Sequence, residues 1–138
     1  MQTAPIDVTK ETVETAVLQS NLPLLLDFWA DWCPPCHMVS QWLTRLAQDY
    51  ASQLIVAKVD VSTDKTVADQ FGVSSLPTLL WLVNGEVIYR QVDEINEVGL
   101  RRLVDSLLQA NMSTSNKQDA DHPDLPDGPY QGNQRPIF

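Results

Sequence analysis

The most restrictive feature of the sequence is a nearly unbroken apolar segment at residues 22–30 (LPLLLDFWA), in which Asp27 is the only charge. A strand with one face in water alternates apolar and polar residues, whereas a strand covered by helices on both faces is apolar throughout. Residues 54–59 (LIVAKV) repeat the second pattern, with Lys58 as their only charge. Both segments therefore predict central strands of a sheet that lies between helices.

Helical spacing of apolar residues alternates with these strands. Residues 6–8 predict a short first strand, and Thr9 is a suitable N-cap for a helix that follows it. A second helix is expected from near residue 33 to about residue 49. Ser62 is the expected N-cap of a short third helix, which ends at Gly72.

The pattern changes after residue 77. Residues 78–83 and 86–90 form two strand-like segments separated by Asn84-Gly85, a strong β-hairpin signal. A terminal helix then carries apolar residues at one face, namely Leu100, Leu103, Val104, Leu107 and Leu108. The predicted order is βαβαβαββα, an α/β fold with a mixed central sheet of about five strands flanked by four helices.

Composition narrows the class of function. Eighteen acidic residues against nine basic ones give a net charge of −9. This balance repels nucleic acid and anionic membranes, which attract basic surfaces. No segment reaches the ~18 uninterrupted apolar residues of a membrane span. We expect one soluble domain that binds neither nucleic acid nor a membrane.

The two ends of the chain differ from its middle. Residues 1–8 (MQTAPIDV) lack the basic and apolar regions of a secretory signal, so a cytoplasmic protein is expected, with an exported mature form as the alternative. Residues 113–138 hold four of the nine prolines and four aspartates. We therefore divide the chain into a domain at 1–112 and a flexible acidic tail at 113–138, either a solubilising extension or a docking segment.

The only two cysteines, Cys33 and Cys36, stand where the first buried strand turns into a helix. A helix N-terminus stabilises a thiolate, so Cys33 is the expected nucleophile. Cys36, one turn later, suits the resolving thiol, and Pro34 and Pro35 fit the first helical turn. The alternatives are inert thiols or half of a zinc site. Zinc is disfavoured because no further cysteine is present, and because His37 beside the pair and His122 in the tail are poorly spaced to complete a tetrahedral site.

Several segments carry a resemblance to a known family. These are residues 27–36 (DFWADWCPPC), 58–61 (KVDV), 71–78 (FGVSSLPT) and 84–85 (NG). Together they resemble the thioredoxin family over about residues 6–110, with Pro34 where the commonest members have glycine. The resemblance implies a thioredoxin-like three-layer α/β/α fold and a redox disulfide between Cys33 and Cys36.

Asp27 and Lys58 are candidate catalytic residues. A lone carboxylate in an apolar strand is costly to bury, so it should be protonated more readily than usual or find a partner. In the family's topology Lys58 lies on the adjacent strand. The resemblance implies that Asp27 accepts a proton from Cys36 while Lys58 tunes it. The alternative is a carboxylate that simply reaches solvent.

The resemblance also implies a substrate groove. Pro77 is expected to be cis and to lie beside the sulfurs, and the backbone of Leu76 is expected to pair with a bound peptide. Trp32 is the expected exposed contact, with Pro34 next to it. Asp93 stands where the family often has glycine, so it adds bulk and charge to the groove.

These expectations combine into a monomeric thiol–disulfide oxidoreductase that reduces protein disulfides without a metal or a bound cofactor. Its electrons would come from a thioredoxin reductase or another dithiol donor. One alternative is an oxidant or isomerase in an exported compartment, because direction depends on reduction potential. Another is a binding module that recruits a partner through the groove or the acidic tail.

Overall fold

The structure is a computed structural model that describes residues 4–92 and 95–116, with side chains described as far as Gln109. It divides into two compact units at the boundary between Ile95 and Asn96. The first unit holds the sheet and both cysteines. Asp93 and residues 117–138 lie outside the described residues.

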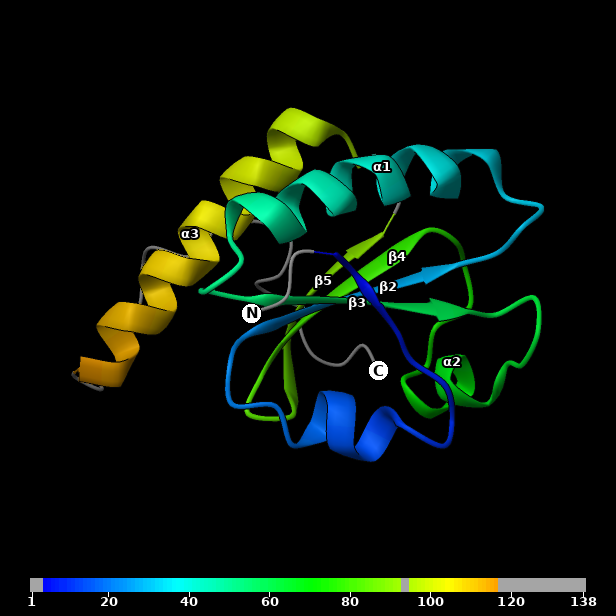
Figure 1. Ribbon diagram of the computed structural model, residues 1–138, viewed down its shortest axis with the longest axis horizontal. Helices are drawn as coiled ribbons and strands as arrows, with labels where there is room; N and C mark the ends of the chain where they lie inside the picture. The colour runs from blue at the N-terminus through cyan, green and yellow to red at the C-terminus, as the bar shows by residue number, and fades with distance from the viewer. Residues whose placement is uncertain (1–3, 93–94, 117–138) are drawn as a thin grey trace. The chain divides into compact units, whose positions relative to one another are not determined.

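A five-stranded mixed sheet forms the centre of the first unit (Figure 1). Its strands are β1 (Ile6–Asp7), β2 (Leu24–Trp29), β3 (Ile55–Asp60), β4 (Thr78–Val83) and β5 (Glu86–Val92). They lie in the order β1-β3-β2-β4-β5. Strands β1 and β2 run parallel to β3, whereas β4 is antiparallel to both β2 and β5. The predicted mixed sheet and element order are confirmed.

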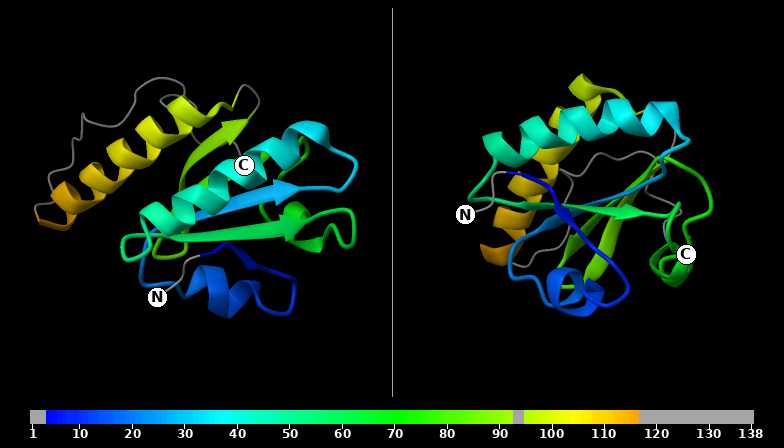
Figure 2. Two further views of the ribbon diagram at one scale, coloured as in Figure 1. Left: turned by 45° about the horizontal axis from the view of Figure 1, so that its top comes forward. Right: turned by 45° about the vertical axis from the view of Figure 1, so that its right-hand side comes forward.

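Strand β2 occupies the middle of the sheet because its side chains are buried on both faces. Every residue from Leu24 to Phe28 is buried. Helix α1 (Pro34–Asp49) covers one face, and η1 (Glu14–Leu18) and α2 (Thr66–Gln70) cover the other (Figure 2). The continuous apolar segment in the sequence is thus explained by two covered faces.

The hairpin between β4 and β5 turns at Asn84-Gly85, as predicted. Asn84 has φ 52° and Gly85 has φ 82°, the positive values that a type I′ turn requires. A β-carbon at position 85 would lie 2.5 Å from the carbonyl oxygen of Leu18. Glycine is therefore needed there for both its conformation and its size.

The N-cap contacts predicted for Thr9 are present: its Oγ1 accepts the N–H of Glu11 at 3.2 Å, and its carbonyl accepts the N–H of Val13 at 2.9 Å. Thr9 and Thr12 bond to each other, with the Thr9 N–H donating to Thr12 Oγ1 at 3.0 Å. The first described helix is the short π-helix η1, which begins only at Glu14. Two hydroxyls close together satisfy the backbone locally and leave a turn ahead of the helix.

The predicted N-cap at Ser62 is wrong. The Ser62 hydroxyl and N–H both donate to Asp60 Oδ1, so this serine closes a turn after β3. Helix α2 begins at Thr66, whose N–H donates to Asp64 Oδ1 at 2.8 Å. Asp64, which lies closer to the helix than Ser62, supplies the acceptor at its start.

The second unit contains helix α3 (Glu97–Asn116). Its start is stabilised by Asn96, whose Oδ1 accepts the N–H of Gly99 at 2.8 Å. One face of the helix is buried at Leu100, Val104 and Leu107, the spacing predicted from the sequence. None of the described helices is long and apolar enough to cross a membrane.

Candidate active site

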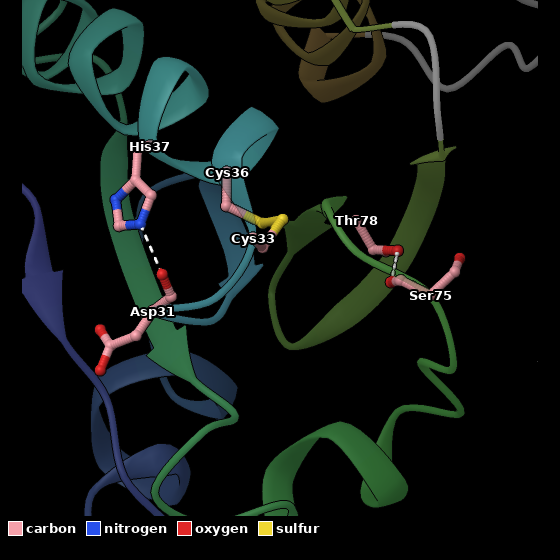
Figure 3. The surroundings of a disulfide bond; sticks show 6 residues. All are labelled: Asp31, Cys33, Cys36, His37, Ser75 and Thr78. Atoms are coloured by element: carbon pink, nitrogen blue, oxygen red, sulfur yellow. Dashed lines mark hydrogen bonds between the residues drawn. A yellow bond between two sulfur atoms is a disulfide. The ribbon is translucent and has the colours of Figure 1, made fainter.

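The two cysteines form a disulfide at the junction of β2 and α1, with their Cα atoms 5.3 Å apart (Figure 3). Cys33 is the N-cap residue of α1 and has an extended backbone, while Cys36 lies in the first turn. The sequence predicted this placement. It puts the Cys33 sulfur at the positive end of a helix of 16 residues.

Local hydrogen bonds explain why the chain turns here. The N–H of Cys33 donates to the carbonyl of Ala30 at 3.2 Å, and the N–H of Cys36 donates to the carbonyl of Cys33 at 3.0 Å. Pro34 and Pro35 occupy the first two helical positions, as expected. These positions suit proline because their N–H groups have no partner within the helix.

The two sulfur-bearing residues differ in accessibility. Cys33 is 6% exposed and Cys36 is 0% exposed, so solvent reaches the pair at the Cys33 side. Trp32, directly before Cys33, is 68% exposed. An incoming disulfide would therefore meet Cys33 first, next to a large apolar surface.

The segment around Pro77 supplies the opposite side of the site. The Leu76–Pro77 peptide bond is cis, as the resemblance implied. Leu76 packs against the core cluster that includes both cysteines. The buried Thr78 donates from its hydroxyl to the carbonyl of Ser75 at 2.7 Å and so ties the two ends of the bend together (Figure 3).

Asp27 is fully buried on β2, and neither of its carboxylate oxygens has a hydrogen-bond partner among the described residues. Burial raises the pKa of Asp27 from 3.8 to about 7, because the charged form loses its water. The positive charge of Lys58 opposes this rise in the pKa. Asp27 is thus a buried group that exchanges a proton near neutral pH.

Lys58 lies directly beside Asp27 in the register of β2 and β3, as expected from the family's topology. Its ammonium nitrogen is 4.8 Å from the centre of the Trp29 ring, a cation–π contact. Trp29 and Lys58 also line a pocket of about 190 Å³ together with Asp7 and Asp60. Asp27 itself does not line this pocket.

His37 makes a contact that the sequence did not reveal. Its Nε2 lies 2.9 Å from the carbonyl oxygen of Asp31 (Figure 3). Its ring also meets the Trp29 ring edge-on, with 6.0 Å between centres. The sequence predicts an exposed surface residue. The side chain is exposed, but it bridges the first turn of α1 and the loop before it.

Two further points concern Asp93 and possible metal ligands. Asp93, the predicted groove residue, is outside the described residues. Within the parts of the chain that the structure describes, no group of three His, Cys, Asp or Glu side chains is placed to hold a metal ion.

Comparison with known proteins gives concordant matches. Residues 4–106 match the family model described as Thioredoxin. The chain is 40% identical over 91 residues to the thioredoxin of Haemophilus influenzae, covering 66% of this chain and 85% of that protein. It is 43% identical over 101 residues to the thioredoxin of Mycobacterium tuberculosis, covering 73% of this chain and 87% of that protein. It is also 41% identical over 97 residues to the bifunctional thioredoxin reductase/thioredoxin of Mycobacterium leprae, covering 70% of this chain and 21% of that protein.

Proposed function

Since this chain belongs to the thioredoxin family and is a thiol–disulfide oxidoreductase, we propose that it reduces disulfides in other proteins, with Cys33 attacking and Cys36 resolving. The observation that carries this assignment of roles is the unequal exposure of the two residues, 6% against 0%. A nucleophile must reach its target, whereas a resolving thiol needs to reach only its neighbour.

The reaction begins with both cysteines reduced. The Cys33 thiolate attacks one sulfur of the substrate disulfide, which forms a mixed disulfide and releases the other substrate sulfur as a thiolate. Cys36 then loses its proton and attacks Cys33, so the second substrate thiol leaves. Two electrons pass to the substrate, and the protein is left with the Cys33–Cys36 disulfide.

Asp27 is the group that we assign to accept the Cys36 proton, directly or through water. Its pKa of about 7 supports this role, because a base works best when its pKa lies near the working pH. Lys58 is a tuning residue in this scheme. Its positive charge stabilises the ionised form of Asp27 and so keeps the base available.

We assign substrate contact to Trp32, Pro34, Leu76 and Pro77, and also to Asp93. An exposed indole beside the attacking sulfur offers a large rigid contact surface. The backbone at Leu76 would pair with an extended substrate segment as an added strand does. Asp93 would disfavour acidic partners in the same groove.

We propose that the protein acts as a cytoplasmic monomer and receives electrons from a thioredoxin reductase or another dithiol donor. The match to a protein named bifunctional thioredoxin reductase/thioredoxin supports a reductase as the donor. We also propose that residues 1–112 carry the activity and that 113–138 form a separate acidic tail.

Trapping of substrates tests the assignment of roles. Cys36→Ser should accumulate mixed disulfides with substrate proteins, visible on a nonreducing gel and released by dithiothreitol. Cys33→Ser is the matched control and should trap none. Insulin reduction should be lost in both variants. Trapping by Cys33→Ser instead would reverse the roles of the two thiols.

A further inference from the structure

We propose that His37 is a positioning residue for protein substrates, because its side chain holds the loop that presents Trp32. This inference rests on the proposed function and concerns how a large substrate docks. Figure 3 shows the His37 ring directed at the Asp31 carbonyl, on the side of the disulfide away from Ser75 and Thr78.

The direction of the hydrogen bond follows from its acceptor. A backbone carbonyl only accepts, so the Nε2 of His37 must carry the proton and donate to Asp31 across 2.9 Å. The neutral Nε2–H tautomer and the imidazolium both have this proton. The contact therefore persists whichever of these two forms is present.

The imidazole ring is held from a second side. Its edge contact with Trp29, at 6.0 Å between ring centres, ties it to the last residue of β2. Trp29 in turn lies under the Lys58 ammonium at 4.8 Å. The imidazole that donates to Asp31 is therefore held in place by a residue of β2 as well as by its own helix α1.

Trp32 lies between two fixed points of the backbone. On one side the Asp31 carbonyl is bonded to His37, and on the other the Cys33 N–H is bonded to Ala30. A loop that is already ordered loses less conformational entropy when a partner docks on it. A protein substrate that covers the exposed indole gains from this order, whereas a small disulfide needs only the sulfur of Cys33.

Two amide variants separate the hydrogen bond from the charge. Gln places its amide nitrogen near the position of the histidine Nε2, while Asn ends one bond short, near Nδ1. His37→Gln should therefore keep the bond to Asp31 and His37→Asn should lose it. Both variants remove the imidazole, so any electrostatic effect of the ring on Cys36 is the same in each.

The readout is steady-state kinetics on insulin and on hydroxyethyl disulfide, with each variant also checked by thermal unfolding. His37→Asn should lower kcat/KM for insulin between about twofold and tenfold, chiefly through KM, as loss of one hydrogen bond allows. Turnover of hydroxyethyl disulfide should stay at the wild-type value. His37→Gln, which keeps the donor but loses the ring contact with Trp29, should retain more insulin activity than His37→Asn and should also leave hydroxyethyl disulfide turnover unchanged.

A double-mutant cycle tests the route through Trp32. In a Trp32→Ala background, His37→Asn should have no further effect on insulin, because the group that it positions is gone. Equal losses in the Gln and Asn variants, equal losses on both substrates, or additive losses in the cycle would each overturn the proposal. Failure of the proposed function looks different, because the wild type itself would then not reduce insulin.

Discussion

Asp27 is fully buried, and its carboxylate has no hydrogen-bond partner within the described part of the chain, so its charge destabilises the folded state. In the unfolded chain the carboxyl group ionises near 3.8, but in the folded protein its pKa is about 7. Between these values the unfolded state has released a proton that the folded state still binds. The stability of the folded state therefore falls as pH rises from about 4 to about 7 and is level above that range.

Replacing Asp27 should remove this dependence of stability on pH. Asp27→Asn cannot ionise, so its stability should not fall with pH in this way. The free energy of unfolding of the variant minus that of the wild type should therefore increase by about 4 kcal/mol from pH 4 to pH 8. Urea unfolding of both proteins across this range measures the difference. A constant difference at all pH values would mean that Asp27 does not titrate with folding.

Lys58 should control the pH at which Asp27 works as a base. Its charge lowers the Asp27 pKa, so Lys58→Met should raise that pKa further and move the rise of insulin reduction to higher pH. Lys58→Arg keeps the charge and is the control. If Met and Arg gave the same midpoint, Lys58 would have no role in tuning.

Individual site residues were predictable to different degrees. The roles expected of Cys33 and Cys36 followed from two cysteines at a strand-to-helix junction, and their placement is confirmed. The burial of Asp27 could be predicted from its apolar neighbours. Its pairing with Lys58 could be predicted only from the family's topology, because the sequence of one strand does not specify which strand lies beside it. The His37 contact was missed because it depends on a rotamer and on a backbone carbonyl, neither of which leaves a sequence pattern.

At the scale of elements, the N-terminus of α1 offers an unusual environment to the Cys33 sulfur. An N-cap side chain normally accepts from the N–H of the second or third helical residue. The second position is Pro35, which has no N–H, and the N–H of Cys36 at the third already donates to the Cys33 carbonyl. The helix therefore stabilises a Cys33 thiolate less than a helix with a free N–H at its second residue would.

Restoring the missing donor should make the protein a weaker reductant. Pro35→Ala adds an N–H at the favoured position, and a hydrogen bond to a charged group of ~1.5–3 kcal/mol corresponds to a potential about 30–60 mV higher. Equilibration with glutathione measures the potential. Pro34→Ala, which adds an N–H at the first position, should change it less. The opposite ranking of the two variants would contradict the capping explanation.

An element was predicted well where the conformation of one or two residues determines it. A helix start was predicted poorly where several side chains can accept the backbone N–H groups. The hairpin at Asn84-Gly85 is fixed by backbone conformation alone. Ser62 failed as an N-cap because Asp60 and Asp64 compete for the same backbone groups, and the carboxylates lie closer to the donors that are used. Where hydroxyls and carboxylates share one short segment, each can accept a backbone N–H, and only the folded geometry decides which of them does.

At the scale of the whole molecule, acidity is a property of the domain more than of the tail. Residues 113–138 contain four aspartates, Lys117 and Arg135, a net charge of −2, so residues 1–112 carry −7 of the −9. The exposed Asp31 adds one of these charges beside the active site. A field of this sign raises the encounter rate with cationic partners and lowers it with anionic ones.

Two disulfide-linked peptides that share a core sequence but are flanked by Lys or by Glu should therefore be reduced at different rates. The Lys peptide should have the higher kcat/KM at about 0.01 M salt, where the Debye length is about 30 Å, and the advantage should shrink at about 0.1 M. A chain truncated after Met112 should keep most of this preference and the wild-type insulin activity, because it retains most of the charge and every residue of the site. If truncation abolished the preference while insulin reduction persisted, the tail would be the docking element for charged partners, and acidity would act on partner choice from outside the folded domain.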